Sequence, residues 1–234
     1  PPPTSSRRQR QMCIRDRTRP EAIKMAALIR LLKNDPFFDL TVCNTGQHDE
    51  LIKPVFDLFE IVPDYSLDIM KPGVEVHSMY SAILDSFSKL LKNITPDIVF
   101  VHGDTATTFA SAMSAYLNKN RIAHVEAGLR TGNLYSPWPE EGNRRLVGSL
   151  ANVHYAPTNQ ARENLIREGI QEENIVVTGN TVIDSLVLAS NKLDTDQKLL
   201  NDIQKKYDYL EPNKKTILVT GHSCLLYTSP SPRD

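Results

Sequence analysis

Acidic side chains in this chain stand where short apolar runs end. Asp104 closely follows the run IVFV, Glu126 directly follows IAHV, and the neighbours Glu140 and Glu141 follow a Pro-Trp-Pro loop. Each run is too short for a helix of its own and is typical of a buried parallel strand, whose carboxyl end delivers side chains to a crevice. The pattern therefore predicts that three segments bring carboxylates to one rim.

Neighbouring carboxylates at such a rim are suited to acid-base chemistry. Their proximity and partial burial drive their pKa values apart, so that one accepts a proton while another stays protonated. Arg19 and Lys24 lie at or near the N-terminal end of a predicted helix, where backbone N–H groups and the helix dipole favour an anion. These cations are candidates to hold a phosphate leaving group, and the sequence predicts proton transfer on a phosphorylated substrate.

Several of these residues also have a purely structural interpretation. Asp104 stands directly before Thr105 and could cap the next helix, while Arg19 and Lys24 could be solvated charges. Glu126 is harder to explain in this way, because a carboxylate at the end of an apolar strand is costly to bury without a partner. Both interpretations of Asp104, Arg19 and Lys24 stay open from the sequence.

Metal binding is the alternative chemistry for these acids. His102, His124 and His222 could join them as ligands, but no pair of His is spaced i, i+4 with a Glu. The three Cys show no CxxC spacing, which argues against both a disulfide framework and a zinc knuckle. We therefore predict neither a metal nor a cofactor.

The elements that must position these side chains alternate between strand and helix. The predicted strands cover 38–46, 97–102, 121–125, 153–157 and 174–179, and the predicted helices cover 18–35, 47–59, 74–93, 105–117, 140–151 and 158–169. Alternation with short Gly-bearing links is typical of an α/β fold with a parallel sheet that helices cover on both faces. Ligands of such sheets bind beyond the carboxyl ends of the strands.

Composition bounds the class of protein. With 234 residues and 40% hydrophobic content the chain can bury a real core, and a net charge of −1 argues against general polyanion binding. No apolar run approaches the roughly 20 residues of a membrane span, and the Arg-rich start lacks the apolar region of a secretory signal. The Cys usage fits a reducing compartment, so a cytoplasmic protein is expected.

The two ends of the chain differ from its middle. Residues 1–17 combine Pro, Ser and Arg without a period and are interpreted as a disordered or non-native tail, in preference to a nucleic-acid arm. Residues 18–185 form the predicted catalytic lobe, and residues 186–222 form linker helices and the first strand, 214–222, of a truncated second lobe. Residues 223–234 have no periodic continuation and are a second predicted tail.

Six sequence motifs resemble the non-hydrolysing UDP-N-acetylglucosamine 2-epimerase family. In chain order and at the spacing of that family they are TRPEAIKMA, VHGDT, HVEAGLRTG, YSPWPEEGNR, TGNTVID and ILVTGH. The resemblance covers residues 18–222 and is specific, because six separate motifs rarely coincide by chance. It implies two Rossmann-like lobes that face a cleft, similar to the B-type glycosyltransferase architecture.

The resemblance also implies a reaction. The family removes the proton at C2 of UDP-N-acetylglucosamine, eliminates UDP from C1 to give a 2-acetamidoglucal intermediate, and reverses both steps on the other face of the sugar. The product, UDP-N-acetylmannosamine, is a precursor of bacterial surface polysaccharides. The substrate is also a possible activator, and a homodimer is expected for the complete protein, without nucleic-acid or membrane partners.

Site residues follow from the matched motifs. The resemblance places the catalytic acid-base groups at Asp104, Glu126, Glu140 and His222, and the substrate-binding groups at Arg19, Lys24, Glu141 and Arg144. The sequence does not separate the roles of Glu140 and Glu141. Gln47 and His48 match the region where bacterial members bind the activating UDP-N-acetylglucosamine, although Asp49 stands where the family usually has Arg.

Two departures from the family concern the ends of the chain. Arg17 replaces the Gly of a phosphate-binding turn, and residues 1–16 are not expected to supply the strand before it. After His222 the family continues with Arg-Arg-Glu and a nucleotide-binding lobe, whereas this chain has Ser223 and Cys224. The chain is therefore expected to be an incomplete epimerase with weak or absent activity.

Three other functions are alternatives to this epimerase. A hydrolysing epimerase would release free N-acetylmannosamine, and a nucleotide-sugar binding module would bind without turnover. A phosphate-using glycosyltransferase ranks lower, because its acceptor chemistry does not need three carboxylates around C2.

Overall fold

The computed structural model of the chain describes residues 10–16, 19–45, 49–67, 69, 75–210 and 214–217. The strands are β1 (Arg10–Asp16), β2 (Phe38–Asn44), β3 (Tyr65–Ser66), β4 (Ile98–His102), β5 (Arg121–Val125), β6 (Val153–Ala156) and β7 (Ile175–Val177). The helices are α1 (Arg19–Asn34), α2 (Asp49–Phe59), α3 (Val76–Ile94), α4 (Ala106–Leu117), α5 (Glu140–Leu150), α6 (Asn159–Arg167), the short 3-10 helix η1 (Glu172–Asn174), α7 (Thr181–Thr195) and α8 (Gln197–Lys206).

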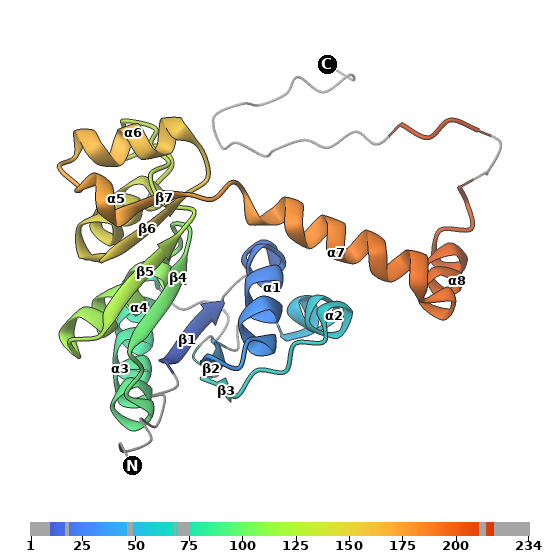
Figure 1. Cartoon of the computed structure of the whole chain (residues 1–234), viewed down its shortest axis with the longest axis horizontal. Coiled ribbons are helices and arrows are strands. Elements are labelled where there is room, and N and C mark those ends of the chain that lie inside the picture. The colour runs from blue at the N-terminus through green and yellow to red at the C-terminus, as the bar shows by residue number, and fades with distance from the viewer. Residues whose placement is uncertain are drawn as a thin grey trace, which may run out of the picture. The chain divides into compact units, whose positions relative to one another are not determined.

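The described strands form one parallel sheet in the order β3-β2-β1-β4-β5-β6-β7 (Figure 1). From β1 the chain adds strands first on one side and then, from β4 onward, on the other. A ligand crevice in such sheets lies at this switch point, outside the carboxyl ends of the strands. The predicted α/β fold with a doubly wound parallel sheet is confirmed.

Strand β1 differs from the tail that we predicted over residues 1–17. The backbone of Arg10–Asp16 pairs with all of β2 on one side and with the start of β4 on the other. Its apolar stretch is only three residues long, so the sequence pattern gave little indication of a strand. Without β1, however, the backbone groups of β2 and β4 would lack a partner at the centre of the sheet, and this pairing does not depend on an apolar pattern.

Two apolar layers hold the helices against the two faces of the sheet. Val99 and Val101 of β4 pack with α3 and α4, and Phe100 between them packs on the opposite face with α1 and α2. Successive side chains of a strand point to opposite faces, so a strand that is apolar throughout must be covered twice. Figure 1 shows α1 and α2 on one side of the sheet and α3 and α4 on the other.

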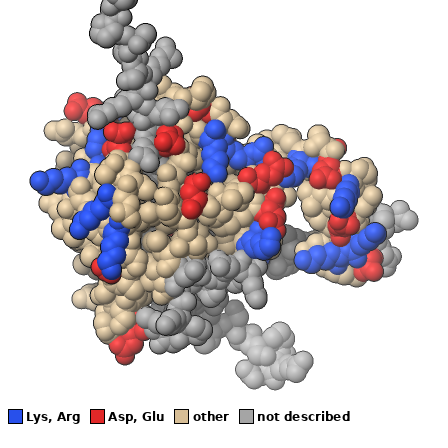
Figure 2. Space-filling model, turned by 90° about the horizontal axis from the view of Figure 1, so that it is seen from below, with Lys and Arg blue, Asp and Glu red and all other residues tan. Residues whose placement is uncertain are grey.

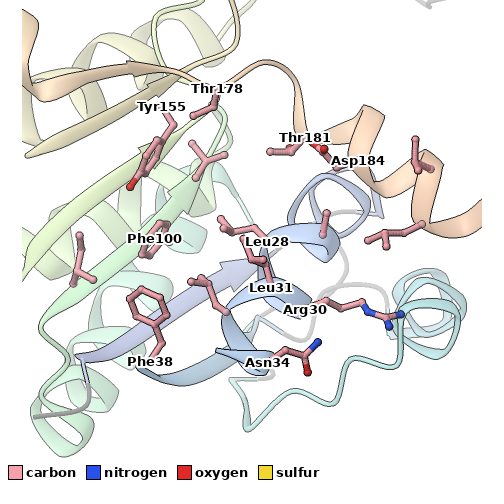
Figure 3. A pocket seen from close by; sticks show the side chains of 16 residues that line it. Leu28, Arg30, Leu31, Asn34, Phe38, Phe100, Tyr155, Thr178, Thr181 and Asp184 are labelled. Atoms are coloured by element: carbon pink, nitrogen blue, oxygen red, sulfur yellow. The ribbon is translucent and has the colours of Figure 1, made fainter. Parts of the chain in front are cut away.

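Part of the sheet face beside α1 is hollowed into an apolar groove of about 870 Å³ (Figure 3). Phe38, Phe100 and Tyr155 rise from the sheet, and Leu28 and residues of α7 form the walls. The rings of Phe100 and Tyr155 are stacked with centroids 6.2 Å apart. Asp104, Glu126, Glu140 and Glu141 do not line this groove, so the candidate acid-base groups lie elsewhere.

The chain divides into two compact units, Pro1–Ser190 and Asn191–Asp234. Residues 181–190 of α7 belong to the first unit, where the buried Ser185 hydroxyl donates to the backbone oxygen of Ile23 in α1 at 2.5 Å. The second unit contains α8, whose N-cap Asp196 accepts from the backbone N–H of Leu199. Residues 214–217 are not in a strand, and the rest of the strand predicted at 214–222 lies outside the described residues.

Charged side chains of both signs lie on the described surface. On the face drawn in Figure 2, Lys and Arg side chains are interspersed with Asp and Glu. Pairs such as Lys53 with Asp57 and Lys89 with Asp85 lie one helical turn apart at 2.7 Å. Among the described residues, no helix has the length and hydropathy needed to cross a bilayer.

Candidate active site

Glu126 is the best-defined acidic group at the carboxyl edge of the sheet. It follows β5 with a φ of +62°, in the left-handed region that is costly for a residue with a side chain. Its Oε2 atom lies 2.5 Å from Nζ of Lys24 on α1 and 3.3 Å from Nε2 of His102 at the end of β4. Side chains from three elements, α1, β4 and the turn after β5, therefore meet at this carboxylate.

The surroundings keep Glu126 ionised. Burial raises the pKa of this carboxyl, but His102 and Lys24 lower it by more, and the net result is a pKa of about 2. Only 15% of the side chain is exposed, so bulk water screens these contacts weakly. At neutral pH Glu126 is an anion that can accept a proton or a hydrogen bond.

A buried histidine fixes the turn that carries the second carboxylate. Nε2 of His124 lies 2.7 Å from the backbone oxygen of Gly103, and because a carbonyl can only accept, this nitrogen carries the proton. Burial lowers the pKa of His124 to about 3, so the ring is neutral. Gly103 has a φ of +68°, and its N–H donates to the backbone oxygen of Val125 at 2.9 Å. The ends of β4 and β5 are thereby tied together.

Asp104 follows this turn and pairs with a cation rather than capping a helix. The N-cap of α4 is Thr105, whose hydroxyl accepts from the N–H of Thr108, so the capping interpretation of Asp104 is wrong. Its Oδ2 atom lies 2.5 Å from Nη2 of Arg144 on α5. The side-chain amide of Asn143 donates to the backbone oxygen of Asp104 at 2.8 Å. Helix α5 therefore holds both the main chain and the side chain of Asp104.

The structure separates the neighbours Glu140 and Glu141, which the sequence could not. Glu140 is half-buried in the first turn of α5, whereas Glu141 is completely buried. The Glu141 carboxylate accepts from the backbone N–H groups of Thr131 and Gly132 and is paired with arginines of its own helix. A direct contact between Glu141 and a substrate, as we expected from the motif, does not fit this burial.

The remaining predicted residues fall into two groups. Arg19 is exposed at the start of α1 and lines a cavity of about 360 Å³ with residues of α2 and α7, apart from the ion pair of Lys24. Gln47, His48 and His222 lie outside the described residues, and so does Arg17. In the described part of the chain, no group of three or more His, Cys, Asp or Glu side chains is placed to hold a metal ion.

Two residues of the site, His102 and Asn143, were not predicted from the sequence as acid-base or substrate-binding residues. His102 was considered only as a metal ligand, but it pairs in register with Val125, so its side chain stands next to Glu126. Asn143 was not selected, although it lies in the motif with Glu140 and Glu141. It is buried, and its Oδ1 accepts from the hydroxyl of Tyr80 at 3.0 Å. Strand register and burial, which a single sequence does not show, were the missing signals.

Sequence comparisons find relatives of this chain. The profile of the UDP-N-acetylglucosamine 2-epimerase family matches residues 30–231. The UDP-N-acetylglucosamine 2-epimerase of Salmonella typhimurium is 51% identical over 205 residues, which are 88% of this chain and 54% of that protein. The chain thus spans about half the length of the curated relatives it matches.

Solved structures show the same likeness. The UDP-GlcNAc 2-epimerase from Neisseria meningitidis, bound to UDP-GlcNAc, matches with a TM-score of 0.83 and 43% identity over 88% of this chain and 55% of that chain. The enzyme from Methanocaldococcus jannaschii, in complex with UDP-GlcNAc and UDP, matches with a TM-score of 0.76 and 33% identity over 85% and 53% of the two chains.

A more distant structure shares the fold alone. A lipopolysaccharide outer core galactosyltransferase is 14% identical, with a TM-score of 0.50 over 73% of this chain and 45% of that chain. The family profile, by contrast, covers most of this chain, including both strands that end in the site carboxylates and helix α5. With half of the matched residues identical to a curated relative, the chain belongs to the UDP-N-acetylglucosamine 2-epimerase family.

Proposed function

We propose that this chain is the catalytic part of a longer non-hydrolysing epimerase that interconverts UDP-N-acetylglucosamine and UDP-N-acetylmannosamine. One observation carries the proposal: Glu126 is held as an anion beside the turn of Asp104, at the ends of two neighbouring parallel strands. Inverting a carbon requires proton removal on one face and proton delivery on the other, and two carboxylates in unlike surroundings are suited to this division.

The proposed reaction balances without a cofactor. A base takes the proton from C2, the electron pair of that C–H bond forms the C1–C2 double bond, and the C1–O bond breaks to release UDP. The 2-acetamidoglucal then adds UDP back at C1 while an acid protonates the opposite face of C2. We assign these proton transfers to Asp104, Glu126, Glu140 and His222, of which His222 lies outside the described residues.

Lys24 has two roles in this proposal. In the structure its ammonium contacts Glu126, and by family resemblance it lies near the diphosphate of the substrate. A bound diphosphate would draw the ammonium away from Glu126, and the loss of this neighbour would raise the pKa of the carboxyl. Glu126 would then become a stronger base when the leaving group is in place.

The test is turnover by the full-length protein with and without Glu126→Gln. We expect kcat to fall by about 10²-fold or more, because the amide cannot accept a proton. Glu173→Gln, at an exposed position of η1, is the matched control and should leave kcat unchanged. Wild-type turnover by Glu126→Gln would contradict the acid-base assignment.

Product analysis by proton NMR in D₂O separates this reaction from its alternatives. The proposed enzyme yields UDP-N-acetylmannosamine with solvent deuterium at C2, and deuterium also enters the recovered substrate. Free N-acetylmannosamine with stoichiometric UDP would identify a hydrolysing enzyme. Calorimetric binding of UDP-N-acetylglucosamine without any product would identify a binding module.

A further inference from the structure

The Glu141 side chain is among the largest fully buried side chains in the described residues. An ionised carboxylate without partners would be strongly destabilising at such a position. Here its Oε2 lies 3.0 Å from the N–H of Thr131 and 3.3 Å from Nη1 of Arg144, and its Oε1 lies 3.3 Å from the N–H of Gly132 and 3.4 Å from Nε of Arg145. These four donors compensate for the burial and leave no room for a substrate atom.

The partners of Glu141 connect two parts of the site. Arg144 contacts Glu141 through Nη1 and Asp104 through Nη2, so its planar guanidinium is held at both ends. Thr131 and Gly132 begin the loop that leads to Glu140, and the Thr131 hydroxyl donates to the backbone oxygen of Ser136 in that loop at 2.6 Å. One buried carboxylate therefore orients the cation beside Asp104 and anchors the loop before α5.

We propose that Glu141 is a positioning residue, which acts on the reaction by holding Arg144 against Asp104. This inference rests on the proposed function, because it assumes that Asp104 takes part in proton transfer. The role differs from that of Glu140 next to it, which is half-buried. The pair of glutamates thus divides into one group for chemistry and one for geometry.

Glu141→Gln tests the proposal with almost no change in shape. The Gln amide has one acceptor oxygen and an NH₂ group, and that NH₂ must face a backbone N–H or a guanidinium, which are themselves donors. The orientation of Arg144 toward Asp104 is then no longer set from both ends. Because small misplacements of catalytic groups are costly, we expect kcat to fall by about 10- to 100-fold while KM changes by less than about threefold.

The assay measures kcat for each calorimetrically counted UDP-N-acetylglucosamine site in the full-length protein. A purely structural role of Glu141 would lower the number of sites and leave kcat per site unchanged. Glu141→Asp keeps the charge and should recover part of the lost kcat, and it serves as the test variant if Glu141→Gln does not fold. Glu173→Gln is again the surface control.

Introducing Glu141→Gln into an Asp104→Asn background gives the decisive comparison. If Glu141 acts through Asp104, the second substitution should add less than about threefold to the loss, because the effects of coupled residues do not add. The same 10- to 100-fold loss in both backgrounds, or wild-type kcat per site for Glu141→Gln, would overturn the inference. A wild-type protein that forms no UDP-N-acetylmannosamine would instead refute the proposed function.

Discussion

Lys24→Met isolates the ion pair on which the electrostatics of Glu126 depend. Methionine keeps most of the apolar stem and removes the ammonium that lies 2.5 Å from Oε2 of Glu126. Burial, which raises the pKa of Glu126, is then opposed only by His102, so the pKa of the carboxyl must rise.

The magnitude follows from the pKa of Glu126. A fall from the ordinary value of 4.5 to about 2 corresponds to about 3 kcal/mol at roughly 1.36 kcal/mol per unit, after the opposing effect of burial. Because His102 and Lys24 share this effect, we expect Lys24→Met to raise the pKa of Glu126 and to remove roughly half of this stabilisation, or about 2 kcal/mol. Both side chains of the pair are at most 25% exposed, so solvent screens their interaction only weakly.

The lowered pKa of Glu126 makes the stability of the folded chain depend on pH. The folded pKa lies below the unfolded one, so the stabilisation is complete above pH 4.5 and is lost as the pH falls toward 2. Lys24→Met should therefore be less stable than wild type at pH 7, and the difference in the free energy of unfolding should narrow below pH 4.5.

The assay is NMR titration of ¹³C-labelled glutamate carboxyls, with the Glu126 signal assigned from Glu126→Gln, together with urea unfolding at each pH. Lys53→Met is the matched control, because its pair with Asp57 is exposed and should contribute little to stability. An unchanged pKa of Glu126 in Lys24→Met would refute the electrostatic argument.

Two further predictions concern the scaffold of the site. Gly128→Ala should destabilise the fold by about 3 kcal/mol or more, because its Cβ would stand 2.2 Å from the backbone oxygen of Ala161. Gly169→Ala, also at positive φ but in open space, should cost only about 1 kcal/mol. Thermal unfolding distinguishes the two variants, and equal losses of stability would contradict the steric argument. His124→Gln should flatten the acid dependence of stability between pH 6.5 and 3, because the wild-type ring is neutral when folded but takes up a proton on unfolding, so wild type loses about 1.36 kcal/mol per pH unit there. Urea unfolding across this range checks that slope, and parallel curves for the two proteins would refute it.

The sequence by itself determined the local elements and the chemistry-bearing segments. Helix α3 is sustained by the 3.6-residue spacing of Met79, Ile83 and Phe87, all of which are buried. The runs before Asp104 and Glu126 were identified as strands because they are short, apolar and followed by turns, and these properties are local. The six motifs gave the family, which the comparisons then confirmed.

Only the tertiary structure decided which partner each functional residue has. Strand β1 is stabilised by backbone pairing with β2 on one side and β4 on the other, and its own sequence does not indicate this pairing. The contact of Lys24 with Glu126 joins residues 102 positions apart, which no local pattern encodes. Glu140 and Glu141 are chemically identical, and only the direction in which α5 turns them makes one a half-exposed carboxylate and the other a buried anchor. Burial and distance belong to the folded chain, and they decide the pKa and the role of a carboxylate whose position the sequence can only indicate.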